Sequence, residues 1–359
     1  MRIPHSKPFL PPDEDYAALI REIRENGWLT NHGPLVQRFE KEAAEFLGVP
    51  RISFLSSGTS GLQCALRTLP RGGEIITTPF SYVATAGTVY WEGFTPVFAD
   101  IDPNTLCLCP EKAEEKFTPN TRAVLATHVY GLPADTRALG ALARDRGVPV
   151  MYDAAHCFGV KTNGKSLLAE GDISILSTHA TKVFHTANGG MAVCANPEDQ
   201  DRIDRFRNFG HDGPNRFDGP GINAKNSEFH AALGLAMLPY AGEILDRRRA
   251  QWKRYADLLG DVPGIRILSI PENTEHNGAY FPLLGLSPER AGKIIDALAA
   301  AGIEARRYFS PSLNKIDYMK GDACPISEAA ADSVFCLPLY HTLSADSQEE
   351  IAERVRKLI

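Results

Sequence analysis

Short apolar runs alternate with helical runs along the middle of the chain, and this alternation limits the possible folds most. A helical run such as 134–146 separates several of the strand-like runs. Strands are expected at 52–55, 74–78, 95–101, 123–128, 148–152, 173–177 and 189–194. Strands that alternate with helices are typical of βαβ units. The sequence therefore predicts an α/β fold with a mostly parallel sheet.

The pattern changes near residue 240. Residues 227–238 form an apolar helical run, and 244–259 is typical of a long connecting helix. Short segments follow to the end, such as a helix at 289–301 and a strand at 304–308. With 359 residues the chain is long enough for two domains. We expect a large domain over 1–240, which includes an N-terminal arm, and a smaller C-terminal domain over 241–359.

Composition excludes several classes of protein. Hydrophobic residues make up 43% and charged residues 23%, which are ordinary values for a globular protein and exclude disorder for most of the chain. The net charge of −6 gives no basic footprint for nucleic acid. No run of about 18 apolar residues is present, so we expect no membrane span.

The cysteines and the N-terminal segment indicate the compartment. The seven cysteines are odd in number and form no CxxC pair, which favours a reducing environment over a disulfide framework. Residues 1–16 lack the apolar stretch of a secretion signal. We expect a cytoplasmic protein without a metal site.

The segment SSGTSG at 56–61 lies between an expected strand and an expected helix. Small residues let backbone N–H groups approach an anion at a helix N-terminus, and hydroxyls add further donors. The candidates for such contacts are Ser57, Gly58, Thr59 and Ser60. The segment matches neither the P-loop nor the dinucleotide fingerprint. Taken alone, it is also typical of a purely structural turn.

Asp153 and Lys182 follow two of the expected strands. Ligands bind outside the carboxyl ends of parallel strands, where a carboxylate can hold a protonated pyridine nitrogen or simply cap a helix. A buried lysine loses pKa, as a Schiff-base lysine must, although most lysines are solvated. An anion site, an acid, a lysine and a nearby aromatic side chain, Tyr82, are together the parts that pyridoxal 5′-phosphate requires.

The chain resembles the DegT/DnrJ/EryC1/StrS sugar aminotransferases over nearly its whole length. The matching segments are WLTNHGPLVQRFE, SSGTSGLQCAL, EIITTPFSYVATA, PVFADIDP, THVYGLPAD, MYDAAH, STHATK and GINAKNSEFHAALGLAML. The resemblance implies fold type I of the pyridoxal-phosphate enzymes, with a seven-stranded, mostly parallel sheet and a smaller C-terminal α+β domain. It also implies a homodimer with shared active sites.

The resemblance assigns roles to individual residues. Lys182 would hold the cofactor covalently and then serve as the base for the proton shift, Asp153 would bind the ring nitrogen, and Tyr82 would stack on the ring. His156 replaces the usual glutamine and would still reach the cofactor. The phosphate contacts would come from Ser57, Gly58, Thr59, Ser60 and Ser177, and from Asn223 or Lys225 of the neighbouring subunit.

The resemblance also implies the reaction. Glutamate is the usual amino donor, and the acceptor is a nucleotide-linked keto sugar. The spellings HATKVFHTANGG and GINAK are most similar to those of members that convert dTDP-4-dehydro-6-deoxyglucose to dTDP-4-amino-4,6-dideoxyglucose for surface polysaccharides. A UDP- or GDP-linked sugar, aminated at C4 or C3, is the alternative. Substrate contacts are expected from Thr30, Asn31, His128, Tyr130, His185 and His211, each of which could instead be a cap, turn or core residue.

Three rival interpretations remain. The sugar 3-dehydratases of this fold carry histidine in place of the lysine, and Lys182 argues against them. A non-catalytic regulator would not need the complete set of cofactor residues. A metal centre built from His128, His156, His179 and His185 would lack any known ligand spacing.

Overall fold

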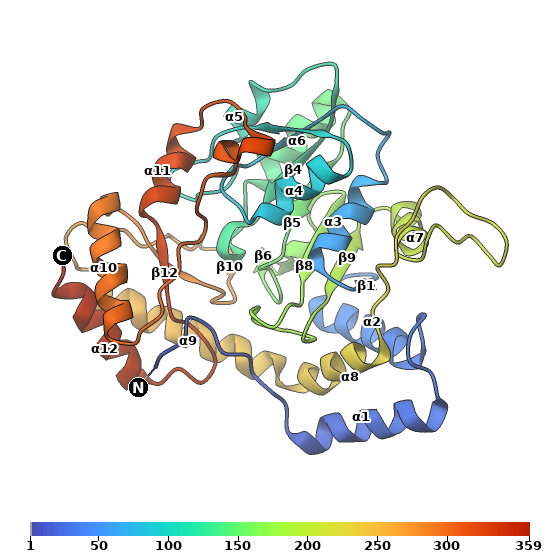
Figure 1. Cartoon of the computed structure of the whole chain (residues 1–359), viewed down its shortest axis with the longest axis horizontal. Helices are drawn as coiled ribbons and strands as arrows, with labels where there is room; N and C mark the ends of the chain where they lie inside the picture. Colours follow the sequence, from blue (N-terminus) through green and yellow to red (C-terminus); the bar gives the residue numbers. More distant parts are fainter. Residues whose placement is uncertain (1) are drawn as a thin grey trace.

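The computed structural model describes residues 2–359, and its centre is a seven-stranded sheet (Figure 1). The strand order is β1-β9-β8-β5-β4-β2-β3. The pairs β3–β2, β2–β4, β4–β5 and β5–β8 are parallel, and β9 is antiparallel to both β1 and β8. The predicted fold class is confirmed. The strands are β1 (Ser53–Leu55), β2 (Glu74–Thr77), β3 (Thr95–Phe98), β4 (Thr121–Thr127), β5 (Val150–Asp153), β8 (Ile173–Ser177) and β9 (Gly190–Cys194).

Apolar side chains project from both faces of this sheet, because a mostly parallel sheet is buried on both faces. Ile75 and Met151 pack into a core on one face, whereas Ile76 and Tyr152 pack into a second core on the other. The first of these cores also contains side chains from α3 (Gly58–Leu66), α4 (Val83–Trp91) and α7 (Pro197–Phe206). The core on the opposite face includes side chains of α6 (Thr136–Arg146), while α5 (Pro110–Glu114) contributes Ala113.

Three further helices pack together. They are α1 (Asp13–Asn26), α2 (Pro34–Leu47) and α8 (Glu228–Met237), and α2 among them lies next to β1. Figure 1 shows α1 and α2 against α8, and a shared core of buried side chains joins them. Glu228 of α8 accepts hydrogen bonds from the backbone N–H groups of Leu35 and Val36 at 2.8 and 3.0 Å, and this ties α8 to the first turn of α2.

The C-terminal part has a core of its own around Phe281, Phe335 and Ile351. Ile3, from the start of the chain, joins this core and pairs with Ile303 in an isolated parallel bridge. The division at residue 240 stays a prediction. The elements are α9 (Ala241–Leu259), α10 (Pro288–Ala300), α11 (Pro325–Ser333), α12 (Ala345–Arg356) and the antiparallel pair β11 (Phe281–Leu283) and β12 (Phe335–Leu337).

A small antiparallel sheet completes the fold with β6 (Lys161–Thr162), β7 (Lys165–Ser166) and β10 (Thr274–Glu275). The strand predicted at 304–308 is wrong, because only an isolated bridge between Arg306 and Cys336 forms there. The chain instead turns toward the cavity described below. None of the helices within 2–359 is long and apolar enough to cross a bilayer.

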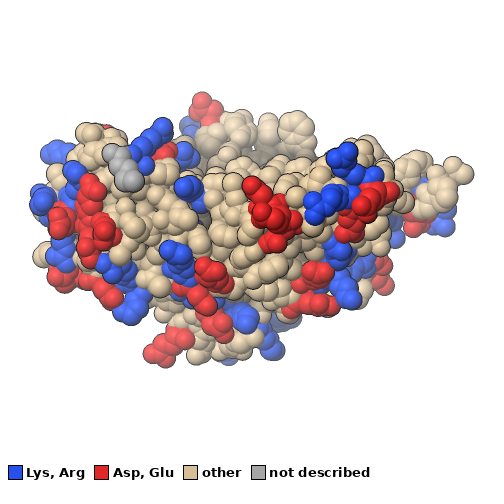
Figure 2. Space-filling view, turned by 90° about the horizontal axis from the view of Figure 1, so that it is seen from below, with Lys and Arg blue, Asp and Glu red and all other residues tan. Residues whose placement is uncertain are grey.

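Charged residues of both signs are present on the face of the molecule that Figure 2 shows. On the face seen in Figure 2, lysine and arginine side chains alternate with aspartate and glutamate side chains, and neither sign dominates. The net charge of −6 is therefore not concentrated on that face.

Candidate active site

A cavity of about 390 Å³ lies where several strands of the large sheet end. Thr127 ends β4, Asp153 ends β5 and Ser177 ends β8, and all three line the cavity. This is the edge at which parallel sheets bind ligands. Eight of the residues expected from the sequence to bind the cofactor meet here: Ser57, Gly58, Thr59, Tyr82, Asp153, His156, Ser177 and Lys182.

The first turn of α3 forms one wall of the cavity. Ser57 is the N-cap residue, and its hydroxyl accepts the backbone N–H of Ser60 at 3.0 Å. Ser60 Oγ accepts the backbone N–H of Ser57 at 3.1 Å in return, which completes a capping box. A Cβ added to Gly58 would lie 3.2 Å from Cβ of Ser177, so the glycine lets the two segments approach closely. Such a helix start offers N–H groups and partial positive charge to an anion.

Ser60 does not line the cavity. It is buried, and its hydroxyl also donates to the carbonyl of Ser57 at 2.9 Å. In this structure Ser60 therefore shapes the turn, and the anion contacts available at α3 come from Ser57, Gly58 and Thr59.

Asp153 is 6% exposed and accepts two hydrogen bonds. Thr85 Oγ1 donates to Oδ2 at 2.6 Å, and the backbone N–H of Ala155 donates to Oδ1 at 3.1 Å. Burial raises the pKa of Asp153, whereas these two donors and the charge of Lys182 act in the opposite direction. A positive ring nitrogen placed beside the carboxylate would lower its pKa further.

Lys182 and His156 face the same space. Burial lowers the pKa of Lys182, partly offset by the charge of Asp153. Burial also lowers the pKa of His156 well below its usual value, so the ring is neutral near pH 7. Its Nδ1 is buried and makes no hydrogen bond in the structure, and the ring lies parallel to that of Phe309 with centroids 5.9 Å apart. This unpaired nitrogen is a free donor or acceptor for a ligand.

Tyr82 is the N-cap residue of α4 and lines the cavity with 59% of its surface exposed. An aromatic ring that borders a cavity and is more than half exposed offers a flat face for stacking.

The C-terminal part contributes residues that sequence reasoning missed. Tyr280, Arg306, Tyr308 and Phe309 all line the cavity. Arg306 is also paired with Glu304 at 2.8 Å. None of the motifs pointed to these residues, because their position depends on how the C-terminal part packs against the sheet. The segment 304–308, which the sequence predicts as a strand, instead contributes Arg306 and Tyr308 to the cavity.

None of the six residues predicted to contact substrate lines the cavity. Three of them, His128, His185 and Tyr130, are hydrogen-bonded within the protein. His128 is fully buried, its ring stacks on Tyr152 with centroids 4.3 Å apart, and its Nδ1 accepts the backbone N–H of Ala134 at 3.0 Å. His185 bonds the carbonyl of Phe9 through Nε2 at 2.7 Å.

Tyr130 is likewise buried and donates its hydroxyl to the backbone carbonyl of Tyr308. Each of these three side chains makes a hydrogen bond inside the protein, although Nε2 of His128 has no partner, and none of the three lines the cavity. The structure of one chain therefore gives no support to their predicted substrate role.

The remaining predicted contacts lie outside this cavity. Asn31 and Lys225 line a second cavity of about 190 Å³, and Lys225 donates to Asn223 Oδ1 at 2.9 Å. Thr30 is exposed in the segment between α1 and α2, and His211 packs against Phe217 with ring centroids 4.6 Å apart. Their roles remain predictions.

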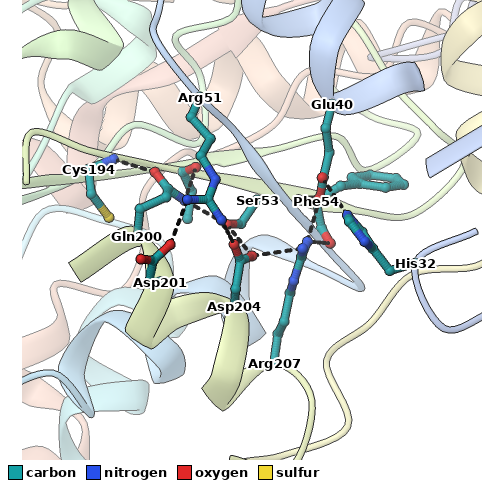
Figure 3. Close-up of polar contacts among 11 residues, drawn as sticks. His32, Glu40, Arg51, Ser53, Phe54, Cys194, Gln200, Asp201, Asp204 and Arg207 are labelled. Atoms are coloured by element: carbon teal, nitrogen blue, oxygen red, sulfur yellow. Dashed lines mark hydrogen bonds and ion pairs between the residues drawn. The ribbon is translucent and has the colours of Figure 1, made fainter. Parts of the chain in front are cut away.

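A partly buried ion network borders the second cavity. Arg207 pairs with Glu40 at 2.5 Å and with Asp204 at 2.7 Å, and His32 bonds the same Glu40 at 2.8 Å (Figure 3). The network joins α2 and α7 to the start of the 207–227 segment, which carries Asn223 and Lys225.

The residues around the first cavity fit pyridoxal 5′-phosphate. The turn at Ser57–Thr59 suits a phosphate, Asp153 suits a protonated ring nitrogen, Tyr82 offers a stacking face, and Lys182 offers an amine with lowered pKa. The unpaired Nδ1 of His156 adds a partner for a polar group on the ring. Within residues 2–359, by contrast, no group of three or more His, Cys, Asp or Glu side chains is placed to hold a metal ion. The fold and this site define a pyridoxal-phosphate enzyme.

Comparison with known proteins identifies the family. The profile of the DegT/DnrJ/EryC1/StrS aminotransferase family matches residues 12–356, so the chain belongs to this family. It is 40% identical to a dTDP-4-amino-4,6-dideoxy-D-glucose transaminase from Shigella dysenteriae, over 98% of each chain.

Two solved structures have the same fold. The crystal structure of DesI with its TDP-sugar product matches with a TM-score of 0.93 and 30% identity, covering 99% of this chain and 92% of that one. The PLP form of the protein Spr1654 from Streptococcus pneumoniae matches with a TM-score of 0.92 and 25% identity, over 100% and 98% of the two chains. The protein is a pyridoxal-phosphate-dependent sugar aminotransferase, as the sequence predicts.

Proposed function

We propose that this enzyme transfers the amino group of glutamate to dTDP-4-dehydro-6-deoxyglucose and forms dTDP-4-amino-4,6-dideoxyglucose. The observation that carries the proposal is the 40% identity, over almost the full length, to the Shigella transaminase named for this product. The DesI complex with a TDP-sugar product supports the same class of substrate.

The chain's own side chains would carry out the proton transfers. When bound, pyridoxal 5′-phosphate supplies an electron sink for the carbon that loses its proton. Lys182 would hold the cofactor and then move that proton at Nζ, for which a lowered pKa is suited. Asp153 would keep the ring nitrogen protonated, and Tyr82 would fix the plane of the ring. Ser57, Thr59 and Ser177 would hold the phosphate.

The substrate assignment is tested by a panel of acceptors. Purified enzyme and glutamate are incubated separately with dTDP-, UDP- and GDP-linked 4-keto-6-deoxyhexoses, and 2-oxoglutarate and the amino sugar are quantified. We expect equimolar products and the highest kcat/KM with the dTDP sugar. A higher kcat/KM with a UDP or GDP sugar would reject the assignment.

We also propose that two copies of the chain form a homodimer with shared sites. The exposed aromatic side chains include four that are between 40% and 63% exposed: Trp28, Phe209, Phe217 and Phe229. They lie in the segment between α1 and α2, in the segment 207–227 and on α8, and Figure 1 shows the 207–227 segment projecting beyond α7. Such exposed apolar groups are typical of a protein interface. A second chain would bring Asn223 and Lys225 to the phosphate.

A cytoplasmic location is part of the proposal. All seven cysteines are free thiols and six of them are buried, which suits a reducing compartment.

A further inference from the structure

Three hydroxyl side chains form a continuous hydrogen-bonded chain that ends on Asp153. Thr127 Oγ1 donates to Ser81 Oγ at 2.9 Å, and Ser81 Oγ lies 2.7 Å from Thr85 Oγ1. Thr85 Oγ1 donates to Asp153 Oδ2 at 2.6 Å. All four side chains are buried, with exposures of 0% to 6%. Within the sequence motif TPFSYVATA, the family resemblance assigns a role only to Tyr82 and gives none to these hydroxyls.

While Asp153 is ionised, the hydrogen bonds between these three hydroxyls can have only one order of donors and acceptors. Each hydroxyl has a single proton, and an ionised carboxylate can only accept. Thr85 must therefore donate to Asp153 and accept from Ser81, and Ser81 must accept from Thr127. All three O–H dipoles then point toward the carboxylate, and hydrogen bonds aligned in this way strengthen one another in a buried site.

The fold brings the three hydroxyls together from neighbouring strands. Thr127 ends β4 and is paired in register with Asp153 at the end of β5. Ser81 follows β2, the other neighbour of β4, and Thr85 lies in the first turn of α4. The relay, by which we mean Thr127, Ser81 and Thr85, thus joins three adjacent strand ends to one carboxylate oxygen.

We propose that Thr85, supported by Ser81 and Thr127, is a positioning residue that holds the Asp153 carboxylate in one orientation and keeps it ionised for the cofactor's ring nitrogen. The inference rests on the proposed role of Asp153. Burial alone would favour the neutral carboxyl group, which could not hold a proton on the ring. Besides the relay, Lys182 and Cys157 are the titratable groups that face Asp153, and the Cys157 thiol is neutral because burial raises its pKa.

The test compares Thr85→Val, which removes the hydroxyl and keeps the shape, with Thr85→Ser, which keeps the hydroxyl. The protonation of Asp153 is followed in the cofactor-free protein by infrared titration of its carboxyl stretch, with Asp153→Asn as the blank. In Thr85→Val we expect the midpoint to rise by about one to two pH units, because a hydrogen bond to a charged group is lost. Thr85→Ser should titrate like the wild type.

The loaded enzyme gives a second readout. Thr85→Val should lower kcat about 10- to 100-fold and change each KM less than about threefold, with the acid limb of the kcat profile moved to higher pH. Ser81→Ala keeps the Thr85 donor, so we expect a smaller shift in the same direction. It carries the test if Thr85→Val does not fold.

Thr88→Val is the matched control on the same helix. Thr88 Oγ1 donates only to the backbone carbonyls of Ala84 and Thr85, at 2.8 and 3.0 Å. The Thr88→Val substitution should therefore leave the midpoint of the Asp153 titration unchanged. An unchanged midpoint in Thr85→Val or, if that variant does not fold, in Ser81→Ala would overturn the relay. A wild-type enzyme without transaminase activity would instead reject the proposed function, while the infrared titration of the cofactor-free protein would still test the relay.

Discussion

At the scale of single residues, a polar side chain near a strand end can face the ligand or the core. Asp153 ends β5 and His128 directly follows β4, so both lie at the same edge of the sheet. Asp153 faces the cavity, whereas His128 turns inward to the N–H of Ala134. The expected strands locate both residues, but the direction of His128 depends on a loop whose path no motif predicts.

The buried His128 makes stability depend on pH. Burial lowers its folded-state pKa to about 3, compared with about 6.5 in the unfolded chain. Its contribution is therefore complete above pH 6.5 and is lost as the pH falls toward 3. At pH 5, protonation of this one side chain in the unfolded protein should lower the free energy of unfolding by about 2 kcal/mol.

Urea unfolding of the wild type and of His128→Asn at pH 7 and pH 5 measures this effect. The variant should be less stable at pH 7, because the ring that stacks on Tyr152 is lost. Its loss between the two pH values should be smaller than that of the wild type by about 2 kcal/mol. The same pH dependence in both proteins would contradict the assignment of His128 to the core.

At the scale of elements, the start of α3 and the start of β9 fit together without space for a side chain. A Cβ on Gly190 would lie 2.5 Å from the carbonyl carbon and oxygen of Ser57 and 2.6 Å from the nitrogen of Gly58. Backbone atoms would have to move, and they belong to the turn proposed to hold the phosphate.

We therefore expect Gly190→Ala to destabilise the protein by about 1 to 3 kcal/mol and to weaken cofactor binding at least about tenfold. Gly242→Ala in α9 is the control, since a Cβ there would meet nothing within 4 Å. It should stabilise the protein by up to about 1 kcal/mol and leave cofactor binding unchanged. Thermal unfolding and fluorescence titration with the cofactor measure both effects. Equal cofactor affinity in the two variants would contradict the proposal that the turn at Ser57–Thr59 holds the phosphate.

At the scale of the whole molecule, the large sheet was more predictable than the complete site. Strand ends in a parallel sheet meet at one edge, so the order of motifs along the chain already placed Ser57, Asp153 and Lys182 near one another. The wall formed by Tyr280, Arg306 and Phe309 could not be predicted in this way. Its position comes from packing between distant segments, for which no local periodicity exists.

We expect Lys182→Ala and Lys225→Ala each to lose activity, and a shared site then predicts that the two variants complement each other. Lys182→Ala removes the proposed attachment point, and Lys225→Ala removes a cation that a partner would supply. In a mixed dimer, one site would combine an intact Lys182 from one chain with an intact Lys225 from the other. Activity should therefore reappear when the two variants are unfolded and refolded together, compared with each refolded alone. No recovery in a verified mixed dimer would contradict the sharing of Lys225.

We propose that the cavity beside β5 and β8 holds pyridoxal 5′-phosphate on Lys182. The most direct measurement is reduction of the loaded enzyme with borohydride, followed by peptide mapping by mass spectrometry. We expect one reduced cofactor adduct per chain, on the peptide that contains Lys182, and none in Lys182→Ala. An adduct on another lysine, such as Lys225, with Lys182 unmodified would contradict it.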